Sequence, residues 1–226
     1  YNWKCLCEKP LGYNFNQTNK IVSKLKKNNI KNFFIGLNRR GYFSTRSAIK
    51  IIKKNSFKKK RKIEIIDQEN LEYQKKIGTN KKVINNFMFV NSVHLIDYTN
   101  FFCRGSIKRI ETLSPYKGNI PHVVSKIIYF ASGDECIYKC YWNLEARWSI
   151  TIKSGKSFIK LKPLEKIFSN YKLKKSSTNK KLKKWDKIYK PGLKFQLIEF
   201  LKNNQTLLLT PEMYLSLAKR IKKIYS

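Results

Sequence analysis

A helical pattern runs from Val83 to Cys103, VINNFMFVNSVHLIDYTNFFC, and limits the folds that this chain can adopt. Side chains recur along this stretch at steps of three and four, which is the spacing of one helix face. The members of that face are Phe87, Val90, Asn91, His94, Asp97, Tyr98 and Phe101. The face is apolar at both ends and polar in the middle. The pattern predicts a long amphipathic helix over residues 83–103.

Four polar side chains occupy the centre of this helix face, namely Asn91, His94, Asp97 and Tyr98. They place an amide, an imidazole, a carboxylate and a phenol within about one and a half turns. A helix that only fills a core rarely carries four polar residues on its inner stripe, because each needs a hydrogen-bond partner. The group therefore indicates a functional site. The alternative is a buried histidine that the core itself satisfies.

The chain carries a net charge of +35, from 49 Lys plus Arg against 14 Asp plus Glu. Such a charge is typical of proteins that bind nucleic acid or anionic membranes. Only 8 of the 49 basic residues are Arg, however, and nucleic-acid readers favour Arg for bidentate contacts. Ala is rare while Asn, Ile, Phe and Tyr are abundant, so a composition bias explains the charge better than a basic face. We expect no specific nucleic-acid partner.

The five cysteines are odd in number and form no CxxC pair. This predicts neither a disulfide framework nor a metal site. The longest apolar runs fall far below the roughly 18 residues of a membrane span, which predicts no membrane partner. No secretory signal is visible either. We therefore expect a cytoplasmic protein with reduced thiols.

The N-terminal region has the pattern of a βαβ unit. It predicts a strand at residues 3–7, a helix at 16–28 and a second strand at 33–37. Polar residues follow both strands, as Glu8-Lys9-Pro10 and as Asn38-Arg39-Arg40. A right-handed crossover makes such strands parallel, so that both ends lie at one edge of the sheet. Open α/β sheets bind their ligands at that edge.

The remaining chain predicts helices and an antiparallel sheet. A helix at residues 44–54, a strand at 63–66 and a polar, irregular segment at 70–82 precede the long helix. Strands joined by short turns are then expected at residues 107–113, 123–130, 136–142, 147–153 and 157–161. The lysine-rich residues 172–190 predict a mobile loop, and residues 193–201 and 211–225 predict helices. One sheet face should pack against the helices and the other against a partner subunit.

Four blocks of sequence occur in the order found in one enzyme family. They are CEKP (7–10), FIGLNRR (34–40), IIDQEN (65–70) with NNFMFVNSVHLIDYTNFFCRG (85–105), and PGLKFQLIEFL (191–201). Over about residues 4–225 the chain resembles the glucose-fructose oxidoreductase, inositol dehydrogenase and MocA (Gfo/Idh/MocA) family. The resemblance implies the end of a Rossmann-type α/β domain over residues 1–43. An open, mostly antiparallel α+β domain with helices on one face, for substrate binding and oligomerisation, would follow over residues 44–226.

The resemblance also implies an activity and roles for several residues. Members of this family are NAD(P)-dependent oxidoreductases, which transfer hydride between a sugar hydroxyl carbon and nicotinamide. By the EKP motif, Glu8 would bind the nicotinamide ribose, Lys9 would contact nicotinamide and substrate, and Pro10 would follow a cis peptide bond. The family's helix histidine acts as acid and base and corresponds to His94. The implied catalytic residues are thus Lys9 and His94, and the implied cofactor is NAD or NADP.

We expect the substrate, a sugar or sugar derivative, to meet several polar side chains. Asn91, Asp97 and Tyr98 would bind hydroxyl groups or orient His94, because polyhydroxy ligands need donors and acceptors at fixed angles. Arg40 would bind a carboxylate or phosphate of the substrate. The alternative for Arg40 is a solvated strand end.

The chain departs from the family pattern in two places. Many members carry an Asp four residues before the helix histidine, where this chain has Val90. Either Asp97 or Asn91 takes that role, or the proton relay is simpler or impaired. The family's glycine-rich βαβ unit is absent; in a family member it would lie within the roughly 100 residues before CEKP. We therefore expect the C-terminal portion of a longer enzyme. The alternatives are a basic RNA-binding or ribosome-associated protein and a non-catalytic remnant of the family.

Overall fold

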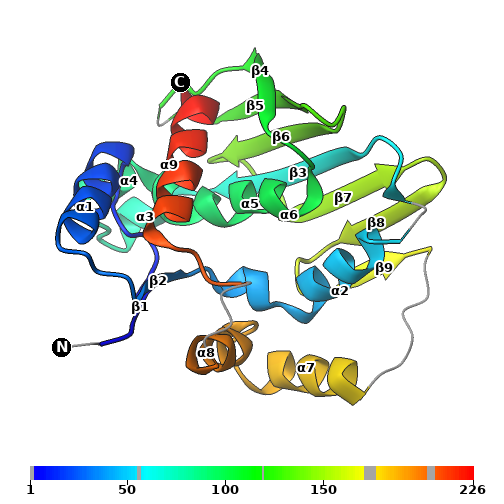
Figure 1. Ribbon diagram of the computed structural model, residues 1–226. Helices are drawn as coiled ribbons and strands as arrows, with labels where there is room; N and C mark the ends of the chain where they lie inside the picture. The colour runs from blue at the N-terminus through cyan, green and yellow to red at the C-terminus, as the bar shows by residue number, and fades with distance from the viewer. Residues whose placement is uncertain (1–2, 55–56, 119, 171–176, 203–206) are drawn as a thin grey trace.

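Two sheets share one hydrophobic core in the computed structural model, which describes residues 3–54, 57–118, 120–170, 177–202 and 207–226. A two-stranded sheet lies near the N-terminus and a seven-stranded sheet follows it in the chain. The C-terminal helix α9 (Pro211–Tyr225) packs between them, against the first helix and against the helices of the larger sheet (Figure 1). The helix that carries His94 therefore lies where the two sheets meet.

The N-terminal βαβ unit is confirmed. Strands β1 (Cys5–Glu8) and β2 (Phe33–Gly36) pair in parallel across helix α1 (Phe15–Lys27). The α1 helix begins where the Asn14 side chain accepts a hydrogen bond from the Gln17 amide at 2.9 Å, which satisfies a free N-terminal donor. A short 3₁₀ turn, η1 (Asn38–Gly41), follows β2 directly. The residues after β1 and those after β2 thus share one edge, as predicted.

The larger sheet is mostly antiparallel, which confirms the predicted architecture. Its strands, in spatial order, are β4 (Ile107–Ser114), β5 (His122–Phe130), β6 (Glu135–Trp142), β3 (Lys62–Glu69), β7 (Ser149–Ser154), β8 (Ser157–Leu161) and β9 (Ile167–Ser169). The early strand β3 lies at the centre, parallel to β6 and antiparallel to β7. The sequence did not indicate β9. It also did not indicate that β3 enters the middle of the sheet.

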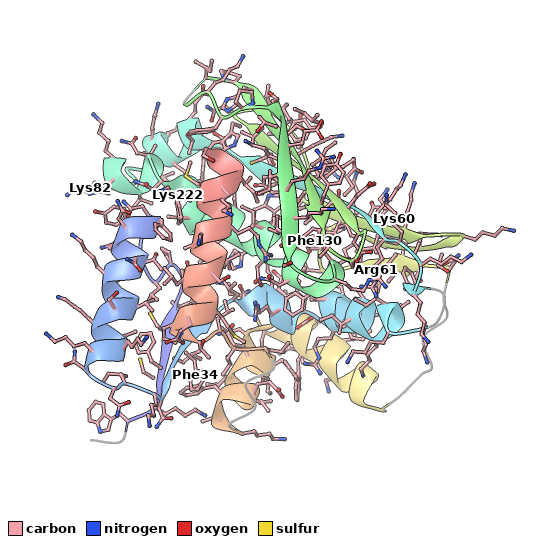
Figure 2. All side chains as sticks on the ribbon, turned by 45° about the horizontal axis from the view of Figure 1, so that its top comes forward. Phe34, Lys60, Arg61, Lys82, Phe130 and Lys222 are labelled. Carbon is pink, nitrogen blue, oxygen red and sulfur yellow. The ribbon has the colours of Figure 1, made fainter. Side chains whose placement is uncertain are left out.

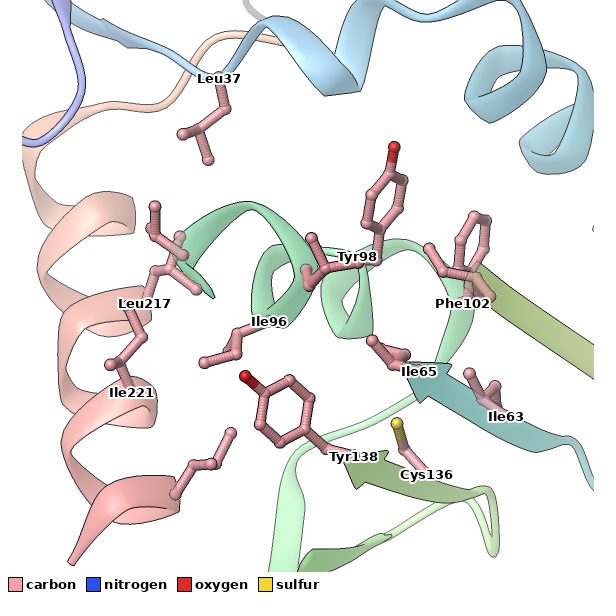
Figure 3. Close-up of a cluster of buried hydrophobic side chains, with 14 of the residues drawn as sticks. Leu37, Ile63, Ile65, Ile96, Tyr98, Phe102, Cys136, Tyr138, Leu217 and Ile221 are labelled. Atoms are coloured by element: carbon pink, nitrogen blue, oxygen red, sulfur yellow. The ribbon is translucent and has the colours of Figure 1, made fainter. Parts of the chain in front are cut away.

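Alternation along β3 decides what faces the helices. Ile63 and Ile65 are buried on the inner face, and Asp67 and Glu69 continue the same row. Figure 3 shows Ile63 and Ile65 beside Phe102 and Tyr98 of the helical layer. Full burial of each such apolar side chain is worth roughly 1.5–3 kcal/mol. This packing holds two carboxylates under the helix that carries His94.

The predicted single helix over residues 83–103 is interrupted. It consists of α4 (Lys81–Ile84), a π-helical turn η3 (Met88–Ser92), α5 (Val93–Asp97) and α6 (Thr99–Phe102). The wider π turn changes the phase of the side chains, which a 3.6-residue repeat does not anticipate. The last two residues of η3 donate hydrogen bonds to Glu69 below them. The helix path was therefore predicted correctly and its regularity was not.

Two segments predicted as irregular contain helices. Within residues 70–82, helix α3 (Leu71–Lys76) begins at Asn70, whose side chain accepts from the Tyr73 amide at 2.8 Å. Helix α7 (Ser177–Ile188) occupies most of the predicted loop over residues 172–190, of which residues 172–176 lie outside the described part. Asp186 of α7 accepts hydrogen bonds from the distant backbone amide of Phe43 and from that of Gly192, six residues further along the chain. Such tertiary contacts are invisible in a weakly patterned sequence.

The other helices agree with the prediction. They are α2 (Phe43–Ile52), α8 (Leu193–Leu201) and α9. The α9 helix begins at Thr210, whose hydroxyl accepts from the Met213 amide at 3.3 Å, with Pro211 in the first turn. Residues of α8 pack against η1, so the PGLKFQLIEFL block meets the NRR block in space.

Basic side chains occur on well-separated parts of the surface. Figure 2 shows Lys82 and Lys222 on the helical side and Lys60 at the opposite end of the large sheet. That the positive charge reflects the composition of the whole chain stays a prediction. Among the described residues, no helix combines the length and the apolar character that a membrane span requires.

Candidate active site

Lys9 stands at the carboxyl end of β1 and reaches into the helical layer. Its ammonium nitrogen donates a hydrogen bond to the backbone carbonyl of Val90 at 2.6 Å. Burial lowers the pKa of Lys9 to about 8, and the nearby positive charge of Arg39 adds to this effect. The peptide bond between Lys9 and Pro10 is cis, as the resemblance implies. The side chain of the preceding residue, Glu8, is exposed.

Val90 lies inside the π-helical turn, four residues before His94. This is the position at which many members of the Gfo/Idh/MocA family carry an Asp. A backbone carbonyl accepts the Lys9 ammonium here, so the contact does not depend on an acidic side chain. The carbonyl oxygen keeps the lysine beside the helix but carries no full charge.

His94 lies in α5 and is 3% exposed. Its Nδ1 is buried and has no hydrogen-bond partner among the described residues. Burial lowers the pKa of His94 well below the ordinary value of 6.5, and the cations of Arg39, Lys9 and Lys190 lower it further. The imidazole is therefore neutral at neutral pH. A buried polar atom without a partner in the protein is a candidate contact for a ligand.

Two buried carboxylates that the sequence interpretation did not select lie under this site. Glu69 accepts hydrogen bonds from the Asn91 amide at 2.8 Å and the Ser92 hydroxyl at 2.7 Å. Burial raises the pKa of Glu69, and the neighbouring Asp67 raises it further. Lys9 is close enough to attract the Glu69 charge. Glu69 thus supplies a carboxylate near Lys9 from the sheet, and it orients Asn91.

Asp67 lies one step earlier on the same face of β3. The Tyr138 hydroxyl donates to it at 2.7 Å and the Gln68 amide at 2.8 Å. Burial raises the pKa of Asp67 to about 6, because it outweighs these hydrogen bonds. Strict alternation from Ile63 was the signal that could have placed both acids in the core.

The predicted substrate residues Arg40 and Asp97 face each other. The guanidinium Nε and Nη2 donate to the two carboxylate oxygens at 2.6 Å each, with side chains only 8% and 3% exposed. Tyr98, the next predicted residue, pairs its hydroxyl with that of Thr45 at 2.8 Å, and burial raises its pKa. All three are engaged within the protein. That they bind substrate stays a prediction.

Arg39, which the sequence interpretation passed over, faces the Lys9 and His94 region instead. Its guanidinium carbon lies 4.2 Å from the centre of the Trp148 ring. Its buried Nε has no hydrogen-bond partner in the described part of the chain. The positive charge of Arg39 contributes to the lowered pKa values of both Lys9 and His94. Two adjacent arginines at the end of β2 thus point to different environments.

Comparison with known proteins places the fold. No protein-family model and no curated protein matches the chain. A solved WlbA dehydrogenase from Bordetella pertussis, in complex with NADH and UDP-GlcNAcA, is similar with a TM-score of 0.74 and 11% identity, over 99% of this chain and 70% of that one. An aldose-aldose oxidoreductase from Caulobacter crescentus, complexed with glycerol, is similar with a TM-score of 0.71 and 11% identity, over 99% of this chain and 69% of that one. An oxidoreductase from Thermotoga maritima is similar with a TM-score of 0.68 and 18% identity, over 98% of this chain and 68% of that one.

These structures define the architecture of this chain. The chain has the fold of the Gfo/Idh/MocA-type sugar dehydrogenases, aligned over nearly its whole length. The fold that the sequence resemblance implied is thereby confirmed, including the open sheet with helices on one face. At these identities the likeness concerns the fold, and the chemistry rests on the residues described above.

Proposed function

We propose that this chain is a portion of a NAD(P)-dependent oxidoreductase, which transfers hydride between a sugar hydroxyl carbon and nicotinamide. The observation that carries the proposal is the contact between Lys9 and the Val90 carbonyl, 81 residues apart in the sequence. It brings the residue after β1 to the helical turn before His94. Local structure does not require this meeting, whereas a reaction that needs a donor and a base at one hydroxyl does.

The two side chains have complementary protonation states near neutral pH. Oxidation of an alcohol requires its hydroxyl proton to leave as hydride leaves the carbon. Neutral His94 accepts that proton, because its lowered pKa keeps it unprotonated. Lys9, with a pKa of about 8, is mostly protonated and stabilises the negative charge that develops on oxygen. In the reverse direction His94 returns the proton.

The missing family Asp at position 90 is replaced by two groups. The Val90 carbonyl fixes the Lys9 ammonium, and Glu69 provides negative charge from the sheet below. Asn91 links these two groups, because it follows Val90 in the π turn and its side-chain amide donates a hydrogen bond to Glu69 on β3. This arrangement holds the Lys9 ammonium beside the helix without an acidic residue on it.

The nicotinamide end of the cofactor fits the residues at the carboxyl end of β1. Glu8 is exposed there, and a carboxylate accepts hydrogen bonds from ribose hydroxyl groups. Lys9 and Pro10 continue the same edge, and no strand in the described part covers the outer side of β1. NAD(P), when bound, accepts the hydride. This sequence has no GxGxxG turn for the phosphates, so we assign only the nicotinamide end to it.

The remaining predicted residues receive positioning roles. The Arg40–Asp97 pair and the Tyr98–Thr45 bond fasten η1 and α2 to the helix that carries His94. Asn91 donates to Glu69 through its nitrogen, which leaves its oxygen to accept from a sugar hydroxyl. These contacts tie the helix that carries His94 to η1, α2 and β3.

The test is turnover by the protein at its native length. The native-length protein should reduce NAD or NADP when it is given a substrate from one of four classes, namely aldoses, inositols, sugar acids and sugar phosphates. The absorbance of the reduced nicotinamide measures this turnover. Lys9→Met and His94→Ala should abolish most of that signal. Absence of turnover with every class, together with nanomolar RNA binding at physiological salt, would replace the proposal by the RNA-binding alternative.

A further inference from the structure

Arg39 and Arg40 are neighbours in the chain with opposite electrostatic surroundings. Arg40 is neutralised by a buried bidentate pair with Asp97. No carboxylate in the described part of the chain pairs with Arg39, although its Nε is buried. A buried guanidinium donor without a partner is costly, because it has lost water and gained nothing in exchange. Such a donor is explained if a ligand supplies the missing acceptor.

The Arg39 side chain is held in a geometry suited to an anion. Its guanidinium stacks on Trp148 at 4.2 Å, which fixes the plane and leaves the in-plane donors free. The Trp148 indole nitrogen donates to the Gln68 carbonyl at 3.2 Å, so the ring itself is anchored. The Arg39 carbonyl accepts from the Thr45 and Tyr98 hydroxyls, which fixes the backbone.

An open hollow of about 350 Å³ lies next to this stack. It is lined by Gln68, Ala146, Arg147, Trp148, Pro163, Leu164 and the carboxylate of Glu165. The volume is within the range of pockets that hold small ligands, roughly 300–1,000 Å³. Trp148 is the residue that borders both this hollow and the Arg39 guanidinium.

Further cations act on the same region. The positive charges of Lys9, Arg39 and Lys190 each lower the pKa of His94. The acids beneath, Asp67 and Glu69, accept hydrogen bonds from Tyr138, Gln68, Asn91 and Ser92. Neither of them forms an ion pair with Arg39 in the described part of the chain. A neutral sugar would leave the Arg39 guanidinium without a counter-charge, whereas an anionic one would supply it.

We propose that Arg39, stacked on Trp148, binds an anionic group on the sugar substrate. The ligand is a carboxylate or phosphate, so that the substrate is a sugar acid or a sugar phosphate. The guanidinium offers two parallel donors to either group. The inference rests on the proposed function for the reacting hydroxyl, which Lys9 and His94 serve.

Direct binding tests the inference without turnover. Calorimetric titration of the protein with D-glucuronate, D-glucose 6-phosphate, D-glucose and inorganic phosphate separates the carboxylate, the phosphate, the neutral sugar and the bare ion. At least one anionic sugar should bind 10-fold or more tightly than glucose. Equal affinity for all three sugars, or inorganic phosphate binding as tightly as the best sugar, would overturn the inference.

Variants identify the side chain responsible. Arg39→Gln should remove the preference for the anionic sugar, and Arg39→Lys should restore only part of it, because Lys lacks the bidentate fork. Arg109→Gln is the matched control, since Arg109 is exposed on β4 and pairs with Glu111. An unchanged preference in Arg39→Gln contradicts the inference. In the unaltered protein, added salt should weaken binding of the anionic sugar more than that of glucose.

The two proposals fail in different ways. If the anionic sugar binds through Arg39 but no nicotinamide is reduced, the anion site stands and the proposed function fails. If neutral sugars are oxidised and Arg39→Gln leaves kcat/KM unchanged, the function stands and the anion site fails.

Discussion

The ammonium nitrogen of Lys9 lies 2.6 Å from the carbonyl oxygen of Val90, in the helical turn that leads to His94. A residue at the end of a parallel strand is thereby fixed against a helix of the other sheet layer. The contact needs no acidic side chain at position 90. The proposed acid–base site therefore does not require an acidic residue at this position.

Replacing Lys9 by Met should lower kcat by about 10²-fold or more, because the donor that stabilises the developing oxyanion is lost. The assay is nicotinamide reduction by the native-length protein at saturating substrate. Lys20→Met is the control, since Lys20 is exposed on α1. A Lys9→Met variant as active as the control contradicts the donor role.

The pH profile should show an alkaline limb set by Lys9. Turnover should fall as pH rises through about 8, where the lysine loses the proton it donates. The negative charge of Glu69 raises the pKa of Lys9, so Glu69→Gln should move this limb to lower pH. Glu72→Gln, on the exposed side of α3, should leave the limb in place. Identical limbs in both variants would exclude Glu69 as the supporting charge.

The Arg40–Asp97 pair should matter for stability. Asp97→Asn leaves the Arg40 charge buried without compensation, which should cost about 3–5 kcal/mol in the free energy of unfolding. Glu135→Gln breaks the more exposed pair with Lys60 and should cost less than about 1 kcal/mol. Urea unfolding of the three proteins measures both differences. Equal costs would show that the Arg40–Asp97 pair is not desolvated.

Asp67 should make stability depend on pH. Its pKa of about 6 in the folded protein exceeds the ordinary 3.8, so the folded state holds the proton more tightly. The stability contributed by the protonated acid is present below pH 4 and is lost as pH rises through about 6. In Asp67→Asn, the free energy of unfolding should therefore lose about 2–3 kcal/mol less between pH 4 and pH 7 than in the unaltered protein. Parallel unfolding curves for both proteins across this range contradict the assignment.

Much of the fold could be predicted from the sequence because its signals are local. The βαβ unit, the antiparallel strands and helix α9 follow from apolar periodicity and capping residues such as Thr210. The π turn at Met88–Ser92 could not be predicted from local periodicity, and its last two residues donate hydrogen bonds to Glu69 on a distant strand. Helix α7 likewise depends on Asp186 contacting other segments.

Only part of the candidate site could be predicted, because some of its residues meet through tertiary contacts that local sequence does not show. Lys9 and His94 were selected from a family motif, whereas Asp67 and Glu69 required knowledge that β3 is central. Between Arg39 and Arg40 the sequence offers no distinction. Only the structure shows that one faces Asp97 and the other stacks on Trp148.

A double-mutant cycle on Lys9 and His94 tests their shared role most directly. If both act on one hydroxyl, Lys9→Met/His94→Ala should lose about as much kcat as the worse single variant, because groups that act as a unit are not additive. His122→Ala is the control, since the other histidine stacks on Trp142 in the large sheet. The account predicts a strongly non-additive loss, with His122→Ala near the unaltered rate. Losses that multiply independently, or single variants as active as His122→Ala, would contradict it.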